Sequence, residues 1–383
     1  MQHTKIALSI AGAYRNANAR KPRNFMLNSR KAYVPKRSWS AAVQKPPRRQ
    51  ANQIAIARAA GVSVSTVSRA LSNAPGISQE RREQIRKLAQ DTGYFTRPAA
   101  PASSRVLLTY VTSSMAMGGL APFYDAVVAG LSAAAGDAGL GLAVKLVEDS
   151  NFDLARVLRD HADVRPIATL LVGIDARAEI LEHFAGDSGP LVLVNGYDPA
   201  LRFDCVAPNN FFGAALATGR LIEAGHRSLL YLEDHIRWTT VQRRRGFLSA
   251  VGEAPGVSGS VLAITGDREA RLAAGIARRR RGETDWTAVF AVNDMMAIRL
   301  MGALESAGFK VPDDISVVGF DDLLYASMMS PPLSTMSVDC RLIGQQAIAL
   351  LLRRLAEPRA VPLQVDCAVG AKAGSTIARP AQK

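Results

Sequence analysis

From residue 105 onward, short continuous apolar runs alternate with longer stretches in which apolar residues recur every three or four positions. The runs predict buried strands at 106–111, 142–147, 169–172, 191–195, 228–232, 261–264, 289–292 and 316–320. The intervening stretches predict helices at 122–138, 153–160, 176–185, 211–224, 241–250, 269–280 and 295–307. Apolar strands separated by amphipathic helices indicate parallel sheets covered on both faces, here in two doubly wound units.

A shorter helical pattern precedes this body. Ile54, Ala57 and Ala60 recur at helical spacing, and Asn52 is placed to cap the helix that they form. Gly61 follows at the position where a helix ends in a left-handed residue, a conformation that glycine adopts most easily. The spacing therefore predicts a helix that ends in a tight turn.

Two more short helices follow the turn. Ser63 is placed to cap the first of them, and a third helix is predicted from Ser78 to a stop at Gly93. Such short helices need one another to bury their apolar faces. The core that they share is predicted to contain Ile54, Val67, Leu71, Ile85 and Leu88.

The outward face of the middle helix carries Ser65, Ser68 and Arg69. Hydroxyl groups bind phosphates without bulk, and an arginine can bind the O6 and N7 edge of guanine through two hydrogen bonds. We therefore expect a helix-turn-helix over residues 51–95 that reads the major groove of DNA.

The formal charge of +14 is distributed unevenly along the 383 residues. Residues 1–50 contain twelve Lys or Arg and no Asp or Glu, whereas residues 104–383 are close to neutral. Phosphate neutralisation drives non-specific DNA affinity, so the positive charge lies where a DNA contact would use it. Three scattered cysteines without CxxC spacing do not indicate a disulfide framework or a zinc site.

The first fifty residues mix Arg, Lys, Asn, Ser and Pro without sustained periodicity, and we interpret them as a basic, largely disordered extension. Their first nineteen residues also imitate a secretory signal, with Lys5, the apolar stretch 6–13 and Ala17-Asn18-Ala19. That alternative would make the chain an exported solute-binding protein with a cleaved N-terminus. A DNA-reading motif would have no use there, so we favour the extension.

The stretch Ala60-Gly61-Val62-Ser63 to Leu71 matches "A-G-V-S-x-x-T-V-S-R-x-L" without a gap, and Gly93-Tyr94 follows it. This segment resembles the DNA-binding domain of the LacI/GalR family of bacterial transcription regulators. The resemblance implies base contacts from Val64, Ser65 and Arg69, and phosphate contacts from Ser63, Thr66 and Ser68.

Residues 96–104 would be the linker that follows. The family folds this segment into a hinge helix on DNA, with a leucine wedged into the minor groove. Here the wedge position falls on Ser103, and Pro101 falls inside the expected helix, where proline removes a backbone donor. We therefore expect a degenerate hinge.

Landmarks of the body also resemble the family, among them Arg243-Arg244-Arg245-Gly246-Phe247 and the run from Val311 to Asp322. The resemblance implies an effector-binding and dimerisation domain over 105–383 with the periplasmic-binding-protein-like fold of two lobes. Lobe one would contain about 105–208 plus 339–383, and lobe two about 209–338. An effector between the lobes would lie beyond the carboxyl ends of the strands.

The effector residues implied by position in this resemblance come from both lobes. Hydroxyl groups pair well with carboxylates and amides, and arginine binds a carboxylate or a ring oxygen, which suits a sugar, a sugar acid or a nucleoside-like solute. The set comprises Phe123, Tyr124, Arg237, Thr239, Arg243, Asn293 and Asp321.

The sequence lacks the phosphate-binding, metalloprotease and nucleophile-elbow motifs, and its five histidines are dispersed. We therefore expect no catalysis, no cofactor and no metal. The resemblance implies a cytoplasmic, nucleoid-associated transcriptional regulator, expected to be a repressor, that binds operator DNA as a homodimer or larger. A sugar-processing enzyme on the same fold is a further alternative, which turnover of a bound sugar would support.

Overall fold

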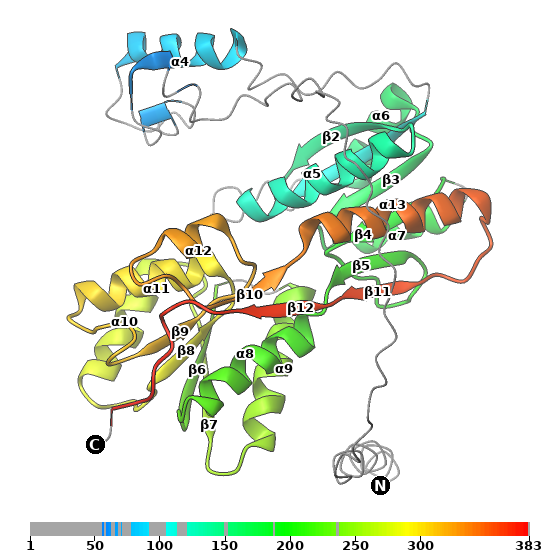
Figure 1. Cartoon of the computed structure of the whole chain (residues 1–383). Coiled ribbons are helices and arrows are strands. Elements are labelled where there is room, and N and C mark those ends of the chain that lie inside the picture. The colour runs from blue at the N-terminus through cyan, green and yellow to red at the C-terminus, as the bar shows by residue number, and fades with distance from the viewer. Residues whose placement is uncertain are drawn as a thin grey trace, which may run out of the picture. The chain divides into compact units, whose positions relative to one another are not determined.

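The computed structural model describes residues 56, 59–62, 66–67, 70, 78–91, 105–112, 121–148, 152–186, 188–234 and 237–381. Contacts between Cα atoms divide the chain into two compact units, Met1–Phe95 and Thr96–Lys383 (Figure 1). We describe each unit by itself. The predicted linker, residues 96–104, lies outside the described residues.

The described part of the N-terminal unit contains the predicted turn and the third predicted helix. Gly61 has a φ of 64°, so the left-handed turn residue is confirmed. The third helix, α4 (Gln79–Asp91), begins as predicted, because the backbone N–H of Arg81 donates to Ser78 Oγ at 3.3 Å. The small core of the N-terminal unit contains Ile56, Ala60, Val67, Ala70 and Ile85, with Val62 and Leu88 packed against it.

Lobe one is built on a parallel sheet with the strand order β11-β5-β4-β3-β1-β2. The four central strands of this sheet are buried along most of their length, as expected for parallel strands covered on both faces. They are β1 (Val106–Thr112), β2 (Gly141–Val147), β3 (Ala168–Val172), β4 (Leu191–Val194), β5 (Asp204–Pro208) and β11 (Gln364–Cys367). The accompanying helices are α5 (Ala121–Asp137), α6 (Leu154–Val164), α7 (Ala178–Ala185) and α13 (Cys340–Ala356), of which α5 and α13 pack side by side (Figure 1).

Lobe two repeats the arrangement with a four-stranded parallel sheet in the order β7-β6-β8-β9. Its strands are β6 (Ser228–Glu233), β7 (Ser258–Ala263), β8 (Ala288–Ala291) and β9 (Ser316–Val318). The helices are α8 (Asn210–Glu223), α9 (Trp238–Glu253), α10 (Arg268–Arg280), α11 (Asp294–Ser306) and α12 (Leu324–Met328). The two doubly wound lobes of the expected fold are therefore confirmed.

A two-stranded antiparallel ribbon, β10 (Thr335–Val338) with β12 (Val369–Lys372), runs between the lobes (Figure 1). The chain crosses there three times: after β5, between β10 and α13, and between β11 and β12. Crossings at three neighbouring points leave the lobes free to move mainly as a hinge.

The expected lobe boundary is wrong for the C-terminal tail, which was assigned to lobe one with the rest of 339–383. Beyond β11 the chain returns to lobe two, where Val317 and Thr376 exchange backbone and side-chain hydrogen bonds. His226 holds the tail farther along, with Nε2 2.9 Å from the carbonyl oxygen of Ala378. The tail packs on lobe two and not on lobe one because it supplies hydrogen-bond partners to buried polar groups of lobe two.

Thr376 attaches the C-terminal tail to lobe two, and we call its hydrogen bonds to Val317 and Ser334 the tail clamp. We predict that this clamp contributes to stability. Thr376 is fully buried; its Oγ1 donates to the carbonyl of Val317 at 2.6 Å and accepts the backbone N–H of Ser334 at 2.8 Å. Thr376→Val keeps the shape but leaves both backbone groups unsatisfied, which we expect to cost about 2–4 kcal/mol in the free energy of unfolding. Urea unfolding measures this cost.

The matched control is Ser375→Ala, because Ser375 is exposed. That variant should unfold like the original chain. Equal stability of Thr376→Val and Ser375→Ala would contradict the clamp.

Candidate effector site

All seven expected effector residues are buried, and they lie just beyond the carboxyl ends of strands in the two lobes or in the helices that follow them. Open parallel sheets place ligands at this edge, because the loops of neighbouring strands meet there. Two groups connect five of the seven residues: Arg243 pairs with Asp321 in lobe two, and Arg237 bonds to Tyr124, which packs on Phe123, at the boundary between the lobes.

The Arg243 side chain donates hydrogen bonds to three groups. Its Nε donates to Asn210 Oδ1 at 2.8 Å, one terminal nitrogen donates to the carbonyl of Val292 at 2.6 Å, and the other donates to Asp321 Oδ1 at 3.2 Å. The guanidinium carbon lies 3.7 Å from the centroid of the Phe320 ring. Arg243 therefore binds together α8, the end of β8 and the segment after β9.

The close packing of α8 on α9 sets this geometry, and it depends on the glycine three residues after Arg243. A Cβ at Gly246 would lie 2.1 Å from the carbonyl oxygen of Phe211, which no side chain permits. Glycine lets the two helices approach closely enough for Arg243 to reach Asn210. The "R-x-x-G-F" pattern thus has a packing reason in this chain.

Asp321 adopts a strained backbone. Its φ is 119° and that of Asp322 is 59°, a region that residues other than glycine rarely occupy. The conformation is held by Arg243 on the side chain and by a backbone N–H bond to the carbonyl of Met336 at 2.9 Å. Strain of this kind persists where the surroundings fix it, and it commonly accompanies a functional position.

Arg237 reaches from lobe two into lobe one. One terminal nitrogen donates to the Tyr124 hydroxyl at 2.7 Å. The other donates to Asp175 Oδ1 and to the carbonyl of Asn195, both at 3.1 Å. Asn195 Nδ2 in turn donates to the Tyr124 hydroxyl at 3.1 Å. A polar network therefore joins the lobes, buried at Tyr124, Asn195 and Arg237 and exposed at Asp175.

The three remaining expected residues have defined local roles. Asn293 caps α11, with Oδ1 accepting the N–H of Met296 at 2.8 Å. Phe123 packs edge-on against Tyr124 with 5.2 Å between ring centroids, and Thr239 is buried in the first turn of α9. None of these roles requires a ligand, so effector contact by this set remains a prediction.

Sequence reasoning missed three polar residues of the two groups: Asp175, Asn195 and Asn210. Asn195 directly follows the apolar strand β4, and Asn210 follows β5 by two residues, so their placement after a strand was the available signal. Asp175 follows β3 in a polar loop, where no pattern distinguishes it from a solvated carboxylate. Its significance comes only from Arg237 across the boundary.

Asp294 is a buried carboxyl group beside this site. Desolvation by burial, followed by the negative charge of Asp321, raises the pKa of Asp294 to about 8. Its oxygens pair with the Thr335 hydroxyl and with the N–H of Leu323 at 2.7 Å. Asp294 therefore connects the start of α11 to β10 and to the strained segment.

Comparisons with known proteins identify the two parts of the chain. Residues 55–97 match the family described as bacterial regulatory proteins, lacI family, and residues 218–375 match the periplasmic binding protein-like domain. The HTH-type transcriptional repressor PurR of Photobacterium profundum is 31% identical over 304 residues, which cover 78% of this chain and 90% of that protein. The chain belongs to the LacI family of bacterial regulatory proteins.

Two further comparisons agree with this assignment. The ribose operon repressor of Haemophilus influenzae is 28% identical over 82% of this chain and 95% of that protein. The crystal structure of the lac repressor dimer bound to operator and the anti-inducer ONPF superimposes with a TM-score of 0.61 at 22% identity, covering 86% of this chain and all of that one. The similarity to the lac repressor structure shows that the two chains share a fold. As a LacI family member, the chain is a DNA-binding transcriptional regulator.

Of the expected DNA-contacting residues of this family member, the structure describes only Thr66, which has helical backbone and is half-buried. Ser63, Val64, Ser65, Ser68 and Arg69 lie outside the described residues. The burial of Val67 and Ala70 places the apolar side of this segment in the core, as the sequence pattern requires.

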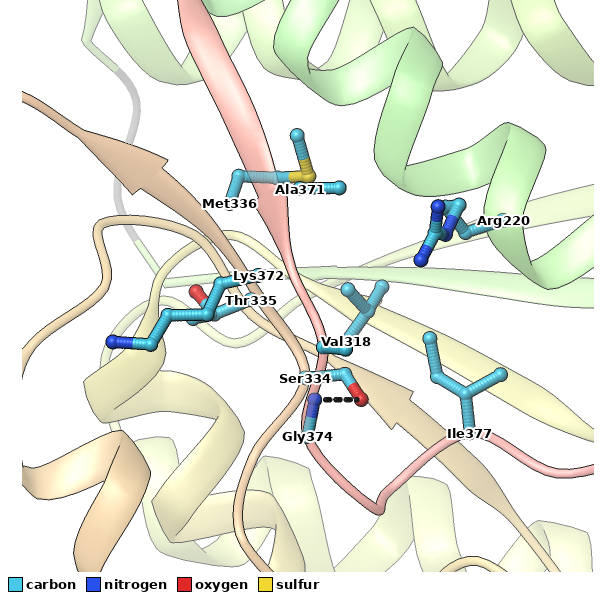
Figure 2. Close-up of a pocket in the computed structure, with 10 residues that line it drawn as sticks. Arg220, Val318, Ser334, Thr335, Met336, Ala371, Lys372, Gly374 and Ile377 are labelled. Atoms are coloured by element: carbon cyan, nitrogen blue, oxygen red, sulfur yellow. Dashed lines mark hydrogen bonds between the residues drawn. The ribbon is translucent and has the colours of Figure 1, made fainter.

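A separate cavity of about 210 Å³ lies between α8 and the hinge ribbon (Figure 2). Figure 2 shows Arg220 on one side and Lys372 on the other, with Val318 between them. Lys372 is paired with Asp322 at 2.7 Å, and Ala373 also lines the cavity. None of the seven expected effector residues lines this cavity.

Within the described ranges, no helix is long and apolar enough to cross a membrane. The same residues contain no group of three or more His, Cys, Asp or Glu side chains arranged to hold a metal ion.

Asp294 generates a prediction about pH. The folded state retains a proton on this carboxyl up to about pH 8, whereas the unfolded state loses it near 3.8, the ordinary pKa of an aspartate. The folded state therefore binds more protons between these values, and its stability falls as the pH rises through this window. Asp294→Asn should flatten that slope, because an amide can donate to Thr335 and accept from Leu323 without carrying charge.

Thermal unfolding of the two proteins from pH 5 to pH 8 checks this. The control is Asp313→Asn, a residue of lobe two that lies away from this cluster. Parallel pH profiles for Asp294→Asn and the original chain would show that Asp294 has no raised pKa.

Proposed function

We propose that this LacI family member is a transcriptional repressor whose operator affinity is controlled by a small molecule held between its lobes. The observation that carries the proposal is the polar network through Tyr124, Asn195 and Arg237, which joins the two lobes at the carboxyl ends of their strands. A molecule bound there contacts both lobes and so has different affinities for open and closed arrangements. That difference is what shifts a conformational population.

The chemistry of the site favours a polyhydroxylated or nucleoside-like effector. Two buried arginines, a carboxylate and amides offer paired donors and acceptors, while Phe123 and Tyr124 offer aromatic surface. Asp321 is suited to accept two neighbouring hydroxyl groups, and Arg237 and Arg243 to bind a carboxylate or ring oxygen. Sugars, sugar acids and nucleosides share these features. The names of two relatives, a repressor PurR and a ribose operon repressor, support regulation by repression.

On DNA, we propose base contacts from Val64, Ser65 and Arg69 and phosphate contacts from Ser63, Thr66 and Ser68. A homodimer places two such helices on half-sites about one helical turn apart, so the operator would be palindromic. The operator-bound dimer of the lac repressor supports this arrangement.

We further propose that the protein acts in the cytoplasm without cofactor or catalysis. Its relatives are regulators that match it across both the helix-turn-helix and the lobes. In the exported solute-binding alternative, the helix-turn-helix that carries the family match would have no use, so we do not favour it. Mature protein that retains residues 52–94 in the cytoplasm would exclude that alternative.

Arg69 is the first test of DNA reading. Arg69→Ala removes a side chain able to bind guanine bidentately, and we expect a loss of about 1–3 kcal/mol in specific binding. Binding to non-specific DNA should remain, because it rests on the total charge. Fluorescence anisotropy with an operator selected from randomised palindromes measures both affinities.

The matched control is Arg271→Ala, which removes an exposed arginine from lobe two. It should bind the operator normally. A uniform loss of affinity for all DNA sequences in Arg69→Ala would contradict its role as a base reader.

Asp321 tests the effector site. Asp321→Asn preserves the shape, tolerates the positive φ and can still accept from Arg243, but it lacks the charge that attracts hydroxyl donors. A screen of sugars, sugar acids and nucleosides by thermal shift on the full chain should find a stabilising compound. Asp321→Asn should lose about tenfold or more in affinity for it, the amount expected for a charged hydrogen bond.

Asp322→Asn is the control, since Asp322 pairs with Ser337 and Lys372 outside the two groups. A stabilising ligand with equal affinity for Asp321→Asn and the original chain would remove Asp321 from the site.

A further inference from the structure

Two consecutive residues at the start of α9 contact lobe one. Arg237 precedes the helix, and its backbone is fixed by Thr240: the Arg237 N–H donates to Thr240 Oγ1 at 2.9 Å, and that hydroxyl donates to the Arg237 carbonyl at 3.0 Å. Trp238 is the first helical residue. The beginning of α9 is thus a rigid part of lobe two from which side chains extend to lobe one.

Asp175 of lobe one receives this helix end with both carboxylate oxygens. Oδ1 accepts from Arg237 at 3.1 Å, and Oδ2 accepts the backbone N–H of Trp238 at 3.3 Å. The first turn of α9 contains no acidic residue of its own. Negative charge is favourable at a helix N-terminus, so lobe one supplies the charge that this helix of lobe two lacks.

An aromatic pair lies beside the carboxylate. The rings of Tyr197 in lobe one and Trp238 in lobe two are stacked, with 4.7 Å between centroids and an interplanar angle of 9°. A cavity of only about 10 Å³ remains among these rings and Gln364, Val365 and Asp366 of β11. The aromatic pair therefore lies beside β11, the edge strand of the lobe-one sheet.

We propose that Asp175 and Tyr197 of lobe one, with Arg237 and Trp238 of lobe two, form an inter-lobe latch that holds the effector cleft closed. The ion pair, the cap on α9 and the ring stack all cross the same boundary. Opening the lobes breaks all three together, while none of them is needed for either lobe to fold. The latch thereby sets the balance of open and closed forms that an effector must shift.

Arg237 gives the latch a direct connection to the effector. It is an expected effector residue, and its guanidinium already binds Asp175 and Tyr124. An effector oxygen that binds Arg237 competes with Asp175 for the same nitrogen. As regulation of that site, the latch rests on the proposed function.

Hydrogen exchange at the Trp238 amide tests the latch without operator or ligand, so its failure is distinct from failure of the proposed function. The decisive variant is Tyr197→Ala, which leaves the Trp238–Asp175 hydrogen bond intact and removes only the ring stack. If the contacts open together, exchange at the Trp238 amide should accelerate about fivefold to tenfold, the worth of an aromatic pair. The radius of gyration from solution X-ray scattering should rise as well.

Two internal references make the result specific. The amide of Val241 bonds to the Arg237 carbonyl within α9, so its exchange should not change. Asp137→Ala, an exposed change elsewhere in lobe one, should match the original chain in both measurements. Tyr197→Leu, which keeps apolar bulk without a ring face, gives the same test should alanine reduce the yield of folded protein.

Three results would overturn the latch. Unchanged exchange at Trp238 in Tyr197→Ala would show that the stack and the carboxylate contact are independent. Equal acceleration at Trp238 and Val241 would show fraying of α9 instead of opening of the lobes. An unchanged radius of gyration in both Tyr197→Ala and Asp175→Ala would show that these contacts do not restrain the lobes.

Discussion

The structure of the effector domain depends on a buried arginine that satisfies polar groups from three segments at once. Arg243 pairs with Asp321, Asn210 and the carbonyl of Val292, and it stacks on Phe320. Desolvating such a pair is costly, and it is tolerated only when the remaining hydrogen bonds are also made. Removing the arginine would leave a buried carboxylate uncompensated, at about 3–5 kcal/mol. Arg243 therefore stabilises the fold of lobe two in addition to its expected role in effector binding.

The same constraint connects fold to function. Gly246 lets α9 approach α8, and Arg243 then reaches Asn210, at the start of the first helix after the lobe crossing. On the other side, Arg243 fixes Asp321 in a strained backbone that hydrogen-bonds to the hinge strand β10. Asp321 is thus connected to β10 by one backbone hydrogen bond. A second arginine, Arg237, joins the lobes directly through Tyr124, Asp175 and the carbonyl of Asn195.

Much of the fold could be predicted from sequence because its strands are continuous apolar runs and its helices have clear stops. Gly61 and Ser78 show this at single positions, where the turn and the cap occur as expected. The hinge was harder to predict. Strands β10, β11 and β12 have only four residues each, and β11 and β12 are largely exposed, so none of them has the apolar run that marks a buried strand. The return of the tail to lobe two depends on Thr376 and His226, whose partners are distant in sequence.

The candidate site, like the fold, could be predicted from the sequence only in part. Family resemblance pointed to Arg243 and Asp321 because they match motifs of the family, and to Arg237 because it lies in the loop just before the first of these motifs. It could not locate Asp175, because a lone carboxylate in a loop has no pattern, and its importance arises only when the other lobe is folded against it. Nor could it distinguish a ligand-binding role for Asn293 from the helix cap that this residue forms.

The central claim is that one small molecule between the lobes and one operator on the helix-turn-helix are energetically coupled. The most direct measurement is a thermodynamic cycle on the full chain: operator affinity with and without the stabilising compound, and compound affinity with and without operator. Linkage requires both ratios to be equal. The account predicts a matched change of at least about fivefold, the lower end for allosteric proteins. Operator affinity that is the same with and without a tightly bound compound would contradict it.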